Sequence, residues 1–96
     1  MIIPYIIMRT LKISIYGKVH GVFFRATAKD KAVEFNINGT VRNAQDCVEI
    51  IAQGSEEDIN KFLEFCKIGP EQAHIKDIKI EELTTDTKYT DFNIIY

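Results

Sequence analysis

Apolar and polar residues alternate near the start of the chain, a pattern typical of a β-strand with one buried face. The alternating residues are Leu11, Ile13 and Ile15, separated by Lys12, Ser14 and Tyr16. Gly17 interrupts the pattern, so we expect a strand over residues 11–16 and then a glycine-flanked loop over residues 17–21.

The apolar spacing lengthens after residue 23, and from there it indicates a helix with one buried stripe. The stripe consists of Phe24, Ala28, Ala32 and Phe35. Asn36 and the pair Asn38-Gly39 are expected to close this helix. Two β-rich runs, residues 40–43 and 48–52, then flank the polar residues 44–46, which predicts a β-hairpin.

A second helix is predicted after Gly54, the residue expected to end the hairpin. Ser55 is a favourable N-cap, and the acidic residues after it suit the positive end of the helix dipole. Gly69-Pro70 should end this helix. Its inward stripe consists of Ile59, Phe62, Leu63 and Cys66. Strands over residues 75–83 and 92–96 complete the pattern.

The resulting order is β-α-β-β-α-β plus a short C-terminal strand. It predicts a ferredoxin-like α/β sandwich of the α+β class, in which two helices cover one face of an antiparallel sheet. The 96 residues are enough for one such domain, and no repeat or linker divides them. Many unrelated functions use this fold, so the fold alone does not decide the function.

Charge is distributed unevenly along the chain, although its net value is only −2. Residues 1–48 hold seven Lys and Arg against three Asp and Glu, whereas residues 49–96 hold five against eleven. An acidic chain argues against a general nucleic-acid binder, and its basic first half suits a small anionic ligand. An RNA-recognition motif shares this topology but needs aromatics on its third strand, and residues 48–52 have none.

The apolar opening, residues 1–8, lacks the features of a secretory signal and is too short to cross a membrane. We therefore expect a cytoplasmic monomer without nucleic-acid or membrane partners. No metal or cofactor is expected, because the cysteines and histidines show neither metal-ligand nor disulfide spacing. These residues are Cys47, Cys66, His20 and His74. We interpret both cysteines as ordinary, buried thiols and His20 as a solvated or hydrogen-bonding residue.

The loop between the first strand and the first helix carries the strongest candidate chemistry. Its sequence is Gly17-Lys18-Val19-His20-Gly21-Val22-Phe23-Phe24-Arg25. Two glycines allow successive backbone N–H groups to converge on an anion, and the start of the helix adds further N–H donors. Arg25 can offer two parallel donors to a phosphate. The alternative is a plain strand–helix turn with a solvated arginine, and the spacing alone leaves both open.

Asn43 is the second candidate because it lies at the end of a predicted strand, just before the hairpin turn. Its amide can donate and accept at once, so it could orient a water molecule beside a bound phosphate. Alternatively, the same side chain serves the turn itself.

Taken together, these residues resemble the acylphosphatase family over about residues 9–96. The family's first motif, approximately G-x-V-Q-G-V-x-F-R, matches residues 17–25 except for His20, where glutamine is usual. The second motif, G-aromatic-V-x-N, matches residues 39–43 except for Thr40.

The resemblance implies hydrolysis of the carboxyl–phosphate bond of a small-molecule acylphosphate, giving a carboxylate and inorganic phosphate. It makes Arg25 and Asn43 the catalytic residues, with Asn43 positioning the attacking water. It assigns phosphate binding to Val19, His20, Gly21, Val22, Phe23, Phe24 and Arg25. A carboxylate, with a pKa of about 4, is a good leaving group, so no general acid is required. Phosphoryl transfer depends mainly on positioning and charge stabilisation, so neither a metal nor a covalent nucleophile is required.

The hairpin after Asn43 departs from the family pattern. It is one residue shorter than usual and has Cys47 in place of glycine. The acylphosphatase-like domain of hydrogenase-maturation carbamoyltransferases has a similarly short hairpin. An alternative function is therefore a non-catalytic domain of the same fold that binds phosphate or carbamoyl phosphate.

Residues 1–8 are predicted to form an N-terminal extension to an acylphosphatase-like domain over residues 9–96. Met8 opens a segment of normal family length, so either an upstream start codon has been assigned in its place or the chain has a genuine apolar arm. Pro4 cannot donate to a sheet ladder. We expect an arm to pack along a sheet edge or against a neighbouring molecule, since exposed apolar patches favour association.

Overall fold

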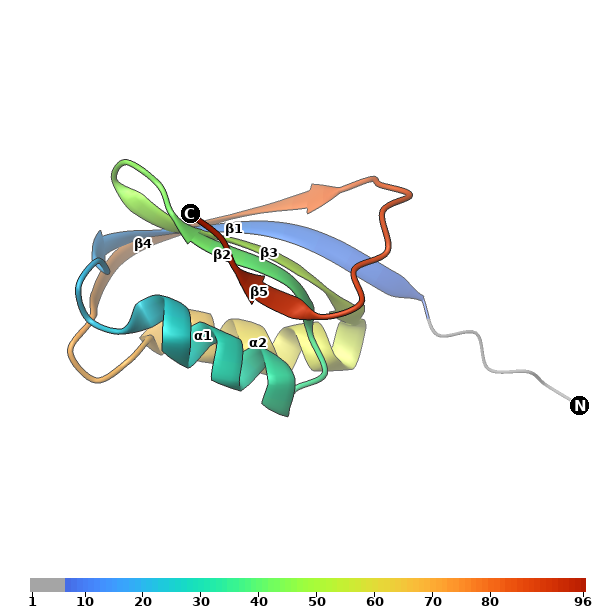
Figure 1. Cartoon of the computed structure of the whole chain (residues 1–96), viewed down its shortest axis with the longest axis horizontal. Helices are drawn as coiled ribbons and strands as arrows, with labels where there is room; N and C mark the ends of the chain where they lie inside the picture. Colours follow the sequence, from blue (N-terminus) through green and yellow to red (C-terminus); the bar gives the residue numbers. More distant parts are fainter. Residues whose placement is uncertain (1–6) are drawn as a thin grey trace, which may run out of the picture.

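The computed structural model describes residues 7–96, and its elements follow the predicted order. They are β1 (Met8–Lys18), α1 (Phe24–Glu34), β2 (Asn38–Asn43), β3 (Cys47–Ser55), α2 (Glu56–Ile68), β4 (His74–Leu83) and β5 (Phe92–Ile94). The strands of this part of the chain form one sheet in the order β4-β1-β3-β2-β5. Both helices cover the same face of the sheet (Figure 1). The predicted ferredoxin-like sandwich is therefore confirmed.

Pairing in the sheet is antiparallel except at one edge. β1 lies between β4 and β3, with Ile13 opposite both Ile80 and Ile50. β2 and β3 form the predicted hairpin, whereas β5 pairs with β2 in parallel and places Ile94 opposite Val41. The expected antiparallel sheet is thus a mixed one. A parallel pair needs a long connection, and here the chain between β2 and β5, which includes β3, α2 and β4, supplies it.

Several strand ends differ from the prediction. β1 continues through Gly17, where its pairing with β4 shifts by a bulge. Asn38-Gly39, expected to close α1, already belongs to β2, and Asn36 with φ 58° turns the chain out of the helix. β5 ends at Ile94. Local sequence misses these ends because partners across the sheet decide where a strand stops.

β1 begins at Met8, the last residue of the predicted extension. Residues 1–6 of the predicted arm, including Pro4, lie outside the described residues, so the packing of the arm and the domain boundary stay predictions.

The core lies between the sheet and the helices and is built from the predicted stripes. Ala28 and Ala32 are fully buried, and such small side chains let α1 lie close to the sheet. The ring of Phe62 in α2 meets that of Phe92 in β5 edge to face, with 6.1 Å between centroids. Cys47 and Cys66 are free and buried, as predicted. The core therefore ties the last strand directly to α2.

The two helices begin in different ways. Ser55 caps α2 as predicted, because its Oγ accepts a hydrogen bond from the Asp58 N–H at 3.2 Å. α1 instead has Phe23 at its N-cap, with φ 60° and ψ 25°, and lacks a side-chain cap. Protein groups thus satisfy the start of α2, whereas the first-turn N–H donors of α1 have no such partner.

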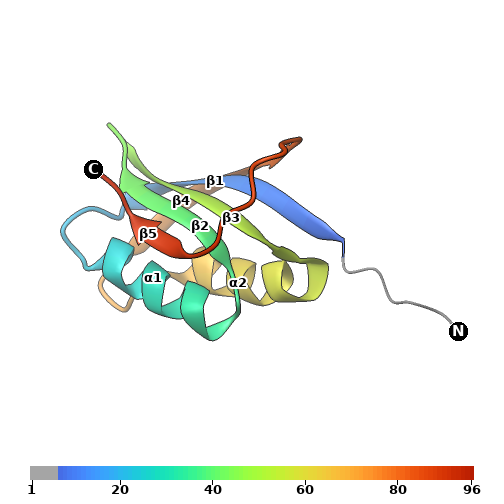
Figure 2. The ribbon, with the colours of Figure 1, turned by 45° about the vertical axis from the view of Figure 1, so that its right-hand side comes forward.

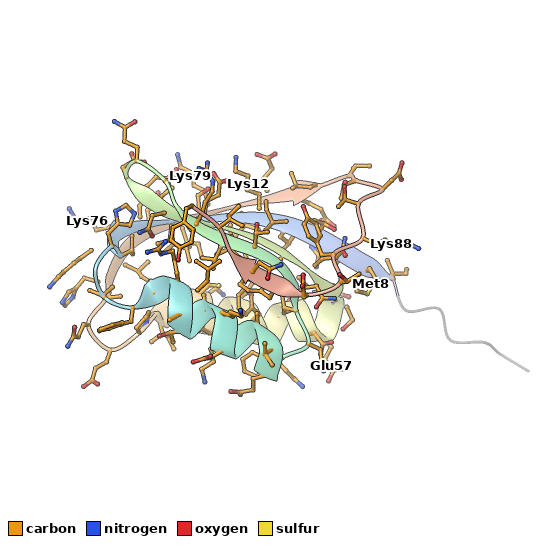
Figure 3. All side chains as sticks on the ribbon, viewed as in Figure 1. Met8, Lys12, Glu57, Lys76, Lys79 and Lys88 are labelled. Carbon is orange, nitrogen blue, oxygen red and sulfur yellow. The ribbon has the colours of Figure 1, made fainter. Side chains whose placement is uncertain are left out.

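The sheet face away from the helices is polar. Glu49 accepts a hydrogen bond from the Arg42 Nε at 3.1 Å and lies 3.7 Å from the Lys12 Nζ. Figure 3 shows Lys12 and Lys79 on this face and Glu57 on the helix side. The alternation of apolar and polar residues along β1 therefore gives the strand one buried face and one solvated face, as predicted. Within residues 7–96, no helix is both long and apolar enough to span a membrane.

The end of the sheet away from the β1–α1 loop is closed by the buried side chain of Gln53. Its Nε2 donates to the Thr10 Oγ1 at 2.9 Å and to the Thr87 carbonyl at 2.8 Å. Its Oε1 accepts from the Tyr89 N–H at 2.9 Å. These bonds fasten the β4–β5 connection to the sheet as that connection carries the chain from one edge to the other (Figure 1).

Candidate active site

The β1–α1 loop, the tip of the β2–β3 hairpin and the C-terminal end of the chain lie at one end of the sheet (Figures 1 and 2). Residues from these segments enclose a cleft of about 360 Å³. Its lining residues are Val19, Gly21, Phe23, Phe24, Arg25, Ala26, Asn43, Ile94 and Tyr96. This volume falls in the lower part of the range for small-ligand sites, ~300–1,000 Å³.

The backbone of the β1–α1 loop is held by glycines and by two buried valines. At Gly17, φ is 130° and an added Cβ would overlap the carbonyl oxygen of His74, so only glycine permits this approach of β1 to β4. Gly21 has φ 70°, a left-handed conformation that glycine adopts without strain. The side chains of Val19 and Val22 are buried in the core, while Gly21 between them is exposed. Anchored in this way, the loop can present backbone N–H groups to an anion.

Arg25 lies in the first turn of α1 and is half-buried. No carboxylate of residues 7–96 lies within ion-pair distance of its guanidinium. The group is instead stacked over the ring of Tyr96, with 5.0 Å between Cζ and the ring centroid. Because Tyr96 is itself exposed, this cation–π contact leaves the planar donors of Arg25 available for two oxygens of one anion.

Asn43 is the last residue of β2, and its exposed side chain lines the same cleft. It stands opposite Val48 in the hairpin ladder. The Ala44 N–H donates to the Cys47 carbonyl at 2.9 Å, which leaves only Gln45 and Asp46 at the tip of the turn. The short turn therefore keeps Asn43 at the end of a paired strand and facing the loop residues.

The side chain of His20 points to the hairpin rather than into the cleft. Its Nε2 lies 2.8 Å from the carbonyl oxygen of Cys47. His20 is thus hydrogen-bonded, one of the two states expected for it. Burial raises the pKa of the Cys47 thiol, and the negative charges of Asp46 and Glu49 add to the effect. This thiol therefore stays protonated near neutral pH and is a poor nucleophile.

The structure brings most of the predicted site residues to one place. Those that line the cleft are Val19, Gly21, Phe23, Phe24, Arg25 and Asn43. His20 and Val22 do not line it, and His74 lies at the start of β4. Among residues 7–96, no cluster of three His, Cys, Asp or Glu side chains could hold a metal ion.

Sequence reasoning missed Ile94 and Tyr96, which form the far wall of the cleft. Their only signal was the apolar ending of the chain, and that ending gave no indication of its partner strand. The two residues reach the loop because the Ile95 N–H donates to the Val41 carbonyl at 2.9 Å, beside the parallel β2–β5 pair.

The chain is similar to known proteins in both sequence and fold. The family model for acylphosphatase matches residues 11–94. The chain belongs to the acylphosphatase family. An acylphosphatase of Syntrophus aciditrophicus is 34% identical over 90 residues, which span 93% of this chain and 94% of the relative. The crystal structure of an acylphosphatase from Bacillus subtilis superposes with a TM-score of 0.88 at 30% identity, covering 94% of this chain and 100% of that one.

The acylphosphatase fold also occurs inside a much larger protein. Full-length HypF, solved in a phosphate- and nucleotide-bound form, matches 94% of this chain with a TM-score of 0.88 at 31% identity. The match covers only 12% of the HypF chain. The chain described here is therefore similar both to small acylphosphatases and to one part of HypF.

Proposed function

We propose that this chain hydrolyses the carboxyl–phosphate bond of acylphosphates, with Arg25 and Asn43 as its catalytic residues. The observation that carries the proposal is that these two side chains, from different elements, line one cleft. Membership of the acylphosphatase family supports the reaction. The geometry supports the division of roles between the two residues.

Phosphate binding falls to the β1–α1 loop and Arg25. The N-terminus of α1 carries a partial positive charge, and its first N–H groups lack a side-chain cap. Arg25 supplies a full charge with two parallel donors. Together these groups stabilise the negative charge that phosphoryl transfer spreads over the phosphate oxygens.

Asn43 orients the attacking water. The water oxygen forms the new bond to phosphorus, and the bond from phosphorus to the bridging oxygen breaks. The bridging oxygen keeps the electron pair and leaves as a carboxylate, while both protons of the water end on the phosphate product. Because the leaving carboxylate is a weak base, whose conjugate acid has a pKa of about 4, the reaction proceeds without a general acid.

The proposal includes a metal-independent, cytoplasmic and monomeric enzyme. The test is turnover of a simple acylphosphate, such as acetyl phosphate, by the purified protein with and without EDTA. We expect release of inorganic phosphate that EDTA does not reduce. No turnover by the folded protein, or turnover that requires an added metal, would contradict the proposal.

A second candidate function is a domain that binds phosphate or carbamoyl phosphate without catalysis. The two-residue turn after Asn43 favours it, since a short turn can fix the amide in a different direction. Calorimetric titration with phosphate, run beside the turnover assay, separates the candidates. Binding without any hydrolysis of acetyl or carbamoyl phosphate would support the second function.

A further inference from the structure

His20 joins the predicted phosphate-binding loop to the hairpin that carries Asn43. It belongs to the β1–α1 loop, and its Nε2 lies 2.8 Å from the Cys47 carbonyl oxygen in the β2–β3 hairpin. A carbonyl oxygen can only accept, so Nε2 carries the hydrogen and donates it. The bond connects residues 27 positions apart, and it forms beside the cleft without entering it.

The carbonyl that His20 holds is close to Asn43 in the hydrogen-bond network. The same Cys47 oxygen also accepts from the Ala44 N–H at 2.9 Å, and Ala44 directly follows Asn43. Cys47 also precedes Val48, which pairs with Asn43 across the ladder. His20 therefore restrains the hairpin at Cys47, which is linked to Asn43 in two ways. It is linked through the neighbouring residue Ala44 and through the paired residue Val48.

Two departures from the family motifs meet in this hydrogen bond. One is His20 itself, where glutamine is usual, and the other is the shortened hairpin with Cys47 in place of glycine. The two-residue turn brings the Cys47 carbonyl to the root of the hairpin, opposite Ala44. The His20 imidazole reaches this carbonyl from the loop, and the distance of 2.8 Å is normal for a hydrogen bond.

We propose that His20 is a positioning residue that fixes Asn43 relative to the phosphate-binding loop. The inference rests on the proposed hydrolysis of acylphosphates. The His20 side chain does not touch the substrate and acts through the hairpin. Its loss leaves the loop backbone and Arg25 in place, so phosphate affinity persists while the water position becomes less well defined.

The kinetic test compares wild type with His20→Ala and His20→Gln on acetyl phosphate. For His20→Ala we expect kcat about three- to tenfold lower, the effect of one net hydrogen bond, with competitive inhibition by inorganic phosphate unchanged. His20→Gln keeps an N–H donor of similar reach and should recover most of the loss. His74→Ala removes the other histidine, which does not line the cleft, and serves as the matched control.

A double-mutant cycle asks whether His20 acts through Asn43. If it does, His20→Ala should cost nothing further in a protein that already carries Asn43→Ala. Equal losses of kcat in both backgrounds would overturn the inference, as would wild-type kcat in His20→Ala. Loss of phosphate inhibition in His20→Ala would also overturn it, because the residue would then serve phosphate binding.

Spectroscopy separates this inference from the proposed function, because it needs no turnover. In the free protein, long-range ¹H–¹⁵N spectra should find the hydrogen of His20 on Nε2. Hydrogen exchange of the Ala44 amide should be faster in His20→Ala than in His20→Gln. Failure of wild type to hydrolyse any acylphosphate would refute the function alone, whereas an Nε2 without hydrogen would refute the positioning role alone.

Discussion

The polar groups at the two ends of the sheet differ in whether protein groups satisfy them. At the end closed by Gln53, the buried amide makes three hydrogen bonds, to Thr10, Thr87 and Tyr89. At the cleft end, Arg25 has no carboxylate partner among the described residues. The N-terminus of α1 at that end also lacks a side-chain cap.

The difference shows which polar groups serve the fold and which are free for a ligand. A buried amide lowers the stability of the fold unless it is hydrogen-bonded, so Gln53 needs hydrogen-bond partners within the protein. Groups that face an open cleft are satisfied by water and can exchange that water for an anion. We therefore expect substitutions at the Gln53 end to change stability and those at the cleft end to change catalysis.

Arg25→Ala should give the largest effect and should act on the reaction alone. Loss of one preorganised donor typically lowers the rate about 10²–10³-fold, and loss of a charged fork at least as much. Arg25→Lys should also be poor, because an ammonium cannot reproduce two parallel donors. Steady-state kinetics measures the loss of activity, and urea unfolding of the same samples measures any change in stability. Arg9→Ala, the same change at the other end of the sheet, is the control. Near-wild-type kcat/KM in folded Arg25→Ala would contradict the assignment.

Asn43→Ala should lower kcat about 10²-fold while inhibition by inorganic phosphate changes less than about threefold. The reason is that Asn43 acts on the water, whereas the loop and Arg25 hold the anion. Initial rates at several phosphate concentrations give both quantities. Asn60→Ala, at an exposed position of α2, should leave both unchanged. A collapse of phosphate affinity together with kcat would make Asn43 a ligand or a structural residue.

Gln53→Ala should act in the opposite sense, on stability alone. It leaves the Thr10 hydroxyl, the Thr87 carbonyl and the Tyr89 N–H without their partner. We expect a loss of about 1–3 kcal/mol in the free energy of unfolding, measured by urea denaturation. Gln72→Ala, at an exposed position, is the control. A fall in kcat per folded molecule as large as that of Asn43→Ala would show that the two ends are not independent.

The Arg9–Glu82 pair at the Gln53 end should give a small, pH-dependent effect. The hydrogen bond from Arg9 lowers the pKa of Glu82 below its ordinary value of 4.5. The pair therefore stabilises the fold above that pH, and the contribution is lost as the pH falls through the lowered pKa. Urea midpoints of wild type and Glu82→Gln should converge between about pH 5 and pH 3. Glu71→Gln, which removes a carboxylate with no ion pair among residues 7–96, should show no such convergence.

A chain that starts at Met8 should show the smallest effect of all. Met8 pairs with Ser55 at the sheet end opposite the cleft, so β1 is retained in full. We expect unchanged kcat and KM for acetyl phosphate. A large loss of kcat with the fold retained, as seen by circular dichroism, would place the N-terminal arm in the site.

The sequence predicted what depends on local patterns. Apolar stripes and the cap at Ser55 located both helices, and the glycine loop located Arg25. It did not predict that β5 pairs in parallel with β2, because no local signal names a strand's partner. For the same reason it missed Tyr96 as a wall of the cleft. The His20–Cys47 bond also escaped prediction, since it requires the loop and the hairpin turn in their folded positions.

The position of β5 also bears on when the protein becomes active during its synthesis. The cleft combines residues of the β1–α1 loop, the start of α1 and Asn43 with Ile94 and Tyr96, which are synthesised after all its other lining residues. A ribosome-bound chain that stops before Phe92 lacks both this wall and the ring that packs on Phe62. The other edge of the sheet also forms late, because β4, which flanks β1, comes from the second half of the sequence. Phosphate release by nascent chains of increasing length would therefore start only when β5 has left the ribosome and docked.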